Sequence, residues 1–174
     1  ETELDVMQRD IEFCKKIGCA GVVSGVLTSE NKIDITATKR LIVASKGMEF
    51  TFHRAFDWCK TPIEALQSLK DIGVTRLLSS GQQANANDGF KLLQELKEAS
   101  NGTIQIMPGG GITNENALQF KNGGFEMIHF SGTKKIQTLA HKPSVSMHSA
   151  VFFEEGIVAT SNKEIISKII KTLS

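Results

Sequence analysis

A histidine, an arginine and an aspartate lie close together at the end of an apolar run, at His53, Arg54 and Asp57. A histidine exchanges a proton near neutral pH, a carboxylate can orient it, and an arginine can hold an anion. These residue types predict a site that binds a small anionic ligand and transfers a proton on it. The alternative is an ion pair that only ties a loop to a strand, since structural pairs also gather charged residues.

The apolar run before these residues predicts a buried strand over residues 49–56. Side chains alternate along a strand, so Phe50 and Phe52 would share one face and His53 would lie on the other. In a parallel barrel the outer face packs against helices, and the inner face opens on the ligand pocket near the carboxyl end. Alternation would turn Arg54 toward the helices, where an unpaired charge is costly, so we expect the strand to end or bulge there.

A second segment with potential chemistry is the glycine run Gly109-Gly110-Gly111, which follows an apolar run and precedes Thr113. Glycines let the backbone approach a ligand, and a helix that begins after Thr113 would add the positive end of its dipole. The hydroxyl of Ser131 and the amide of Gly132 would complete an anion nest. The segment therefore predicts an anion or phosphate site, or else a tight turn alone. Further predicted pocket residues are Ser24, Ser80, Gln105 and His129.

Five apolar runs recur along the chain, and turn residues and an amphipathic helix follow them. The runs cover residues 21–27, 49–56, 76–80, 103–107 and 127–131, so that their starts lie 24 to 28 residues apart. This interval fits a strand, a crossover helix and two short loops, and so predicts a repeated βα unit. The helix signals agree, because Thr61 and Glu64 form a capping box with a proline at the first helical position.

The predicted fold class is α/β, a TIM (β/α)8 barrel of which the chain carries about five βα units. A complete barrel needs eight strands and about 250 residues, and this chain has 174 residues. We therefore expect the first three strands to be missing, and upstream polypeptide or a partner chain to cover the opened edge. Residues 1–174 would form one barrel domain, with residues 143–174 as a C-terminal segment that ends in a packing helix. The alternative is a doubly wound open sheet, although such a sheet gathers ligand groups at one switch point.

Composition excludes several classes of partner. The net charge is +1, from 20 basic and 19 acidic residues, so there is no electrostatic case for nucleic acid or an anionic membrane. No apolar run reaches the eighteen or so residues of a membrane span. The three cysteines, Cys14, Cys19 and Cys59, are odd in number and have no CxxC spacing, which favours a reducing compartment such as the cytoplasm or nucleus.

Several segments resemble the CutC family of copper homeostasis proteins, over about Leu4 to Leu173. They are GVVSGVLT at 21–28, TFHRAFD at 51–57, SGQ at 80–82, MPGGGI at 107–112 and VSM at 145–147. The resemblance implies a TIM barrel, a cytoplasmic or nuclear location, homo-oligomerisation and a role in copper tolerance. Where the family usually has an arginine soon after the serine of its last strand, this chain offers only Lys134 or Lys135 as a point charge.

Copper chemistry limits what the resemblance assigns to this chain. Cu(I) prefers soft sulfur ligands, and the family's proposed copper cysteines lie on the first two strands, which this chain lacks. The resemblance therefore places the Cu(I) ligands outside the chain and assigns no metal ligand within it. We expect Cys14 to be a helix core residue and Cys19 to lie in a turn far from the barrel mouth, which leaves Cys59 alone on the mouth side.

Two functional hypotheses follow, with copper or a small anion as the ligand. The first is a CutC-type copper homeostasis protein that binds or tolerates intracellular copper. The alternative is a TIM-barrel enzyme, isomerase or lyase-like, that acts on a small anionic or phosphorylated metabolite with His53 as the proton-transfer group, Asp57 orienting it and Arg54 holding the anion. A third reading is an interaction protein built on a barrel relic.

Overall fold

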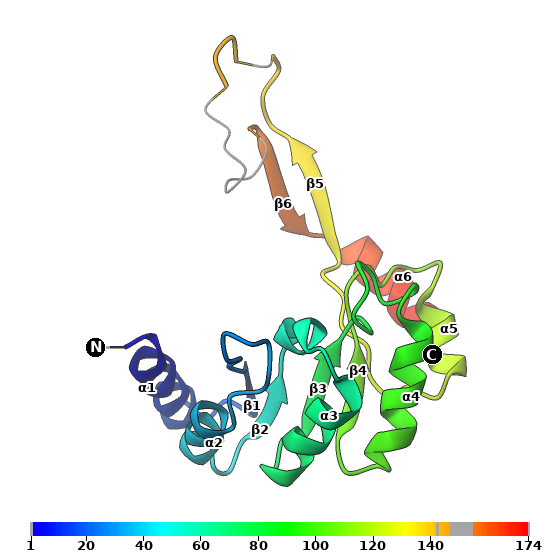
Figure 1. Cartoon of the computed structure of the whole chain (residues 1–174). Helices are drawn as coiled ribbons and strands as arrows, with labels where there is room; N and C mark the ends of the chain where they lie inside the picture. Colours follow the sequence, from blue (N-terminus) through cyan, green and yellow to red (C-terminus); the bar gives the residue numbers. More distant parts are fainter. Residues whose placement is uncertain (1, 142, 147–154, 174) are drawn as a thin grey trace.

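The structure, a computed structural model, describes residues 2–141, 143–146 and 155–173. Four parallel strands form its main sheet: β1 (Gly21–Ser24), β2 (Glu49–Phe52), β3 (Arg76–Ser79) and β4 (Gln105–Pro108). Each strand pairs with the next one in the chain (Figure 1). The α/β class and the parallel sheet are therefore as predicted. A doubly wound sheet would reverse its strand order at a switch point. Here each new strand is added on the same side of the preceding one.

Helices connect the strands in chain order (Figure 1). They are α1 (Glu3–Lys16), α2 (Ile35–Ala44), the 3-10 helix η1 (Arg54–Trp58), α3 (Pro62–Asp71), α4 (Phe90–Ser100) and α5 (Ala117–Asn122). Asp34 caps α2 by accepting from the Ala37 amide at 2.9 Å. An ion pair of 2.6 Å between Arg40 and Asp5 ties α2 to α1. None of the described helices has both the length and the apolar character of a membrane span.

The core lies between the sheet and these helices. Both faces of β2 are buried, since Phe50, Thr51 and Phe52 are at most 3% exposed. Residues that share this core include Leu41, Leu66, Leu69, Leu77, Leu93 and Leu96. The strand ends at Phe52, four residues before the predicted boundary of 56, because the chain turns into η1 at Arg54. The expected end of the strand at about Arg54 is confirmed, because the extended backbone stops at His53 and η1 begins at Arg54.

The fifth predicted strand, over residues 127–131, is wrong as a strand. The structure has only one parallel bridge there, between Gly109 and His129, in which the His129 amide donates to the Pro108 carbonyl at 2.8 Å. In the described chain, β4 is the only neighbour on which this segment could form a ladder. Its direction is parallel to the sheet, as predicted, but the backbone leaves the sheet after the bridge.

The chain next forms an antiparallel hairpin that the sequence pattern did not predict. Its strands are β5 (Thr133–Gln137) and β6 (Ile157–Ser161), paired from Thr133 with Ser161 to Gln137 with Ile157. We call this hairpin the arm, because it projects away from the sheet in Figure 1 and its strands are largely exposed. Helix α6 (Lys163–Leu173) then returns to pack on α5 and buries Ile169. The arm lies outside the predicted strands and leaves the main sheet parallel.

The turn after β3 depends on two glycines whose backbones cross. Gly81 has a φ of +68°, and a Cβ at this position would lie 2.2 Å from the Gly89 carbonyl oxygen. Gly73 has a φ of +84°, but no atom lies within 4 Å of its Cβ position. Gly73 and Gly81 thus share the left-handed conformation, but only Gly73 has room for a side chain.

We predict that Gly73→Ala lowers the free energy of unfolding by about 1 kcal/mol, the cost of a left-handed alanine. Gly81→Ala should lower it by about 3 kcal/mol, because overpacking against Gly89 adds to that cost. Urea denaturation followed by circular dichroism measures both. Equal losses in the two variants would contradict the crossing of the backbones at Gly81 and Gly89.

Candidate functional site

Asp57 holds the ends of β2 and β3 together. Its side chain is 7% exposed, and its carboxylate accepts hydrogen bonds from Arg54 Nε at 2.7 Å and Ser79 Oγ at 2.5 Å. It also accepts from the amide and hydroxyl of Ser80, at 3.1 and 2.9 Å, and from the Gln82 amide at 3.3 Å. Hydrogen bonds to a carboxylate are stronger than neutral ones. The predicted Arg54, Asp57 and Ser80 therefore meet in one network.

His53 is not part of this network, which corrects the predicted pairing of His53 with Asp57. Its Nδ1 accepts from the Ala55 amide at 3.4 Å, so the imidazole caps η1. Its ring packs edge to face on Phe52, with 5.6 Å between the ring centroids. The physical reason is that η1 replaces the strand: Asp57 is displaced from strand alternation and turns toward the serines that follow β3.

The predicted pocket residues Ser24 and Gln105 lie elsewhere. Ser24 is buried at the end of β1, where its carbonyl accepts from the His53 amide at 3.3 Å. Gln105 begins β4, so it lies at the opposite end of that strand from the glycine run. Its side chain accepts from Arg76 at 3.0 Å and donates to Glu126 at 2.9 Å. Gln105 therefore belongs to a polar ladder at the amino end of the sheet and does not line the cleft described next.

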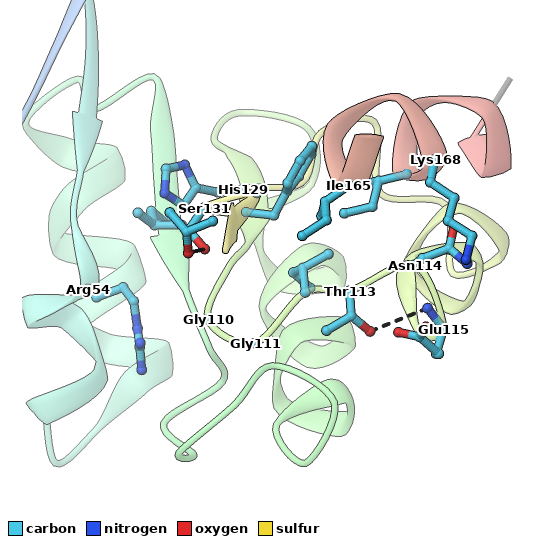
Figure 2. Close-up of a pocket in the computed structure, with 16 residues that line it drawn as sticks. Arg54, Gly110, Gly111, Thr113, Asn114, Glu115, His129, Ser131, Ile165 and Lys168 are labelled. Atoms are coloured by element: carbon cyan, nitrogen blue, oxygen red, sulfur yellow. Dashed lines mark hydrogen bonds between the residues drawn. The ribbon is translucent and has the colours of Figure 1, made fainter. Parts of the chain in front are cut away.

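A cleft of about 640 Å³ opens beside the glycine run (Figure 2). The predicted residues that line it are Arg54, Gly110, Gly111, His129, Ser131 and Gly132. Apolar side chains form another part of its wall, from Leu78, Ile112, Phe130, Ile165 and Ile169. The structure thus brings one arginine, the glycine loop and the base of the arm around a single space. Its size is that of a small-molecule site.

Three residues that line this cleft carry hydrogen-bond donors without partners among the described residues. Arg54 uses Nε and Nη2 for Asp57 and Ser80, while its Nη1 has no partner among the described residues. That nitrogen lies against Gly110, 2.9 Å from where a Cβ would stand, so a side chain at 110 would displace it. In the described part of the chain the amides of Gly111 and Ile112 are also without acceptors. Donors of this kind suit an oxyanion.

No helix begins directly after Thr113, so the helix dipole predicted for this site does not contribute to it. Helix α5 begins at Ala117 rather than directly after Thr113, and it has only six residues. The cation that the sequence reasoning missed is Lys168 of α6, which lines the cleft together with Glu115 (Figure 2). A hydrogen bond from Thr113 lowers the pKa of Glu115, and the Glu115 amide and the Lys168 charge act in the same direction.

Two further predictions concern residues near this site. Lys134 and Lys135 lie on the exposed strand β5 and line no part of the cleft, so the cation there comes from α6. Cys59 is 4% exposed, and burial together with the nearby Asp57 charge raises the pKa of its thiol to about 11. A thiol buried in this way is inert and out of reach of a metal ion. No group of three or more metal-binding side chains occurs within the described residues.

We predict that Asp57→Ala lowers the free energy of unfolding by about 3 kcal/mol, because Arg54 and the hydroxyls and amides around it lose their acceptor. Urea denaturation measures this change. The control is Glu30→Ala, which removes an exposed ion pair with Lys32 and should leave the denaturation midpoint unchanged. Similar midpoints for the two variants would show that the Asp57 network does not stabilise the fold.

Known proteins resemble this chain along most of its length. A CutC family protein of Glaesserella parasuis serovar 5 is 39% identical over 175 residues, which is 100% of this chain and 72% of that protein. A CutC family protein of Bacteroides fragilis is 42% identical over 88% of this chain and 62% of its own length. The one from Pectobacterium atrosepticum is 44% identical over 75% of this chain and 51% of its length. The chain thus spans about half to three quarters of these relatives.

Solved structures agree with this likeness. CutC from Streptococcus agalactiae, which its description assigns provisionally to copper homeostasis, superposes with a TM-score of 0.69 and 32% identity, over 73% of this chain and 63% of that one. A structure described as native KDPGal superposes with a TM-score of 0.57 over 95% of this chain and 63% of that one, at 15% identity, which bears on the fold alone. The sequence model of the CutC family matches residues 1–136. On this match and these relatives, the chain belongs to the CutC family.

Proposed function

We propose that the chain acts in copper homeostasis as a CutC-type protein. The observation that carries the proposal is the family match over residues 1–136. The description of the Streptococcus agalactiae structure, which names copper homeostasis, supports it. Copper is the cargo in this proposal, and the ligands assigned by family resemblance lie outside the chain. A location in the cytoplasm or nucleus and homo-oligomerisation stay predictions.

We also propose that the sheet is part of a TIM barrel. Support comes from its sequential parallel order and from the parallel bridge at His129, which extends the sheet beyond β4. Val23 on the edge strand β1 is 60% exposed. An uncovered apolar edge favours burial by further polypeptide or by a partner chain. Three more strands in that position, with the segment at His129 counted as the fifth strand of the sheet, would bring the total to the eight of a barrel.

The copper proposal is tested in a Pectobacterium atrosepticum strain that lacks its own CutC gene. Expression of this chain, fused behind the first three strands of that CutC so that the ligands assigned by resemblance are present, should raise the copper concentration that halves growth, because bound copper is withdrawn from damaging reactions. The zinc concentration that halves growth should not change, which serves as the control. If the chain accumulates in the cells and their copper tolerance stays that of the deletion strain, the proposal is wrong.

A second candidate function is the binding of a small organic anion in the cleft. It rests on the unpaired donors of Arg54, Gly111 and Ile112 beside an apolar wall. The isomerase or lyase-like reading additionally needs a proton-transfer group. Because Asp57 bonds to Arg54 and the serines rather than to His53, the geometry supports ligand binding more directly than catalysis. The enzyme reading stays a prediction.

We predict that phenyl phosphate binds the chain at least about tenfold more tightly than inorganic phosphate, because the ring buries apolar surface in the cleft. Isothermal titration calorimetry measures both affinities. Ile165→Trp should remove this difference by filling the cleft, since Ile165 is one of its walls. The matched control is Ile170→Trp on the same helix, at a position that is 55% exposed. Equal affinities for the two ligands in the unaltered chain would exclude this site.

A further inference from the structure

The end of α1 folds into a Schellman motif. The Gly18 amide donates to the Lys15 carbonyl at 3.1 Å, and the Cys19 amide donates to the Cys14 carbonyl at 3.0 Å. Gly18 has the left-handed φ of +81° that the motif requires. These two bonds define Cys14 as the third residue from the helix end and Cys19 as the second residue beyond the cap. Side chains at these two positions commonly contact each other in this motif.

The two cysteines are therefore neighbours in space although five positions separate them. Both are free thiols of intermediate exposure. The pairing rests on the backbone, because the hydrogen bond from the Cys19 amide to the Cys14 carbonyl holds the two residues next to each other at the end of the helix. Burial raises the pKa of Cys14, and the neighbouring Cys19 thiol raises it further.

The chemistry of a thiol pair selects among metals. Zn²⁺ in a structural site takes four ligands, and in the part of the chain that the structure describes no third metal-binding side chain joins the pair. Cu(I) is soft and favours thiolates. Lys15 and Lys16 in the last turn of the helix supply positive charge beside the pair. The pair fits a soft monovalent ion better than a metal that needs a full cage.

We propose that Cys14 and Cys19 bind one Cu(I) between their two sulfur atoms. Two thiol protons pass to solvent, two sulfur–copper bonds form, and copper keeps its +1 state. This inference deepens the copper proposal by placing a ligand pair within the chain, where family resemblance assigns none. The expectation that Cys14 is a helix core residue is wrong, since its exposure is intermediate and it lies outside the buried core. The sequence signal is a Gly between two cysteines at a helix end, which a search for CxxC spacing passes over.

The test is an anaerobic titration of the 174-residue chain with Cu(I), in competition with the chromophoric ligand bicinchoninate. The unaltered chain and Cys59→Ala should each bind one Cu(I), because Cys59 is buried. Cys14→Ser and Cys19→Ser should each bind at least about thirtyfold more weakly. Affinity should also rise by about two powers of ten per pH unit between pH 6 and 7, since two protons leave on binding. X-ray absorption should show two sulfur ligands on copper.

Several results would overturn the inference. Equal affinity in all four proteins, loss of binding in Cys59→Ala alone, or nitrogen and oxygen ligands on copper would each exclude the pair as the site. The inference would also be wrong if the chain loses two hydrogens in air, as a Cys14–Cys19 disulfide forms, but the reduced chain binds no Cu(I). Failure of the copper proposal looks different: Cu(I) would bind to the pair, while expression of the chain would leave copper tolerance unchanged.

Discussion

The buried carboxylate of Asp57 is the interaction on which the candidate site depends. Asp57 lies in η1 after β2, yet its oxygens accept hydrogen bonds from the end of β3. The donors are the side chain of Ser79 and the backbone amide of Ser80. One ionised group thereby fixes two neighbouring strand ends and orients Arg54 toward the cleft. A buried charge is stable only with such complete pairing. The position of the arginine follows from that need.

Periodicity predicted the frame of the molecule well, because the strand starts and the helix caps are local features. The parallel sheet, the starts of β2 and β3 and the proline that begins α3 all follow from short-range patterns. The predicted capping box of α3 is wrong, because Thr61 makes no side-chain hydrogen bond there. The role of Asp57 could not be predicted in this way. Strand alternation assigns it to the face of His53, but η1 shortens the strand and rotates the carboxylate toward residues more than twenty positions away. The orientation of the Asp57 carboxylate is therefore determined by hydrogen bonds to residues distant in the sequence.

The missed elements share a similar cause. The arm has no repeat partner in the sequence, and its first strand, β5, is mostly polar and carries no apolar signal. Lys168 reaches the cleft only because α6 packs on α5 after the arm. The cysteine pair lies at the end of α1, just before β1 begins, whereas the cleft lies past the carboxyl ends of β3 and β4. The chain therefore carries two candidate binding sites at opposite ends of its sheet, with different chemistry.

The arm joins the body at the cleft through both of its strands. Ser131, Gly132 and Thr133 enter β5 from one wall, and β6 leads directly into α6, which forms another. The Asn162 amide closes this junction by donating to the Gly132 carbonyl at 2.9 Å. The residues that support the arm are thus the residues that form two walls of the cleft, so the shape of the cleft and the placement of the arm depend on the same junction.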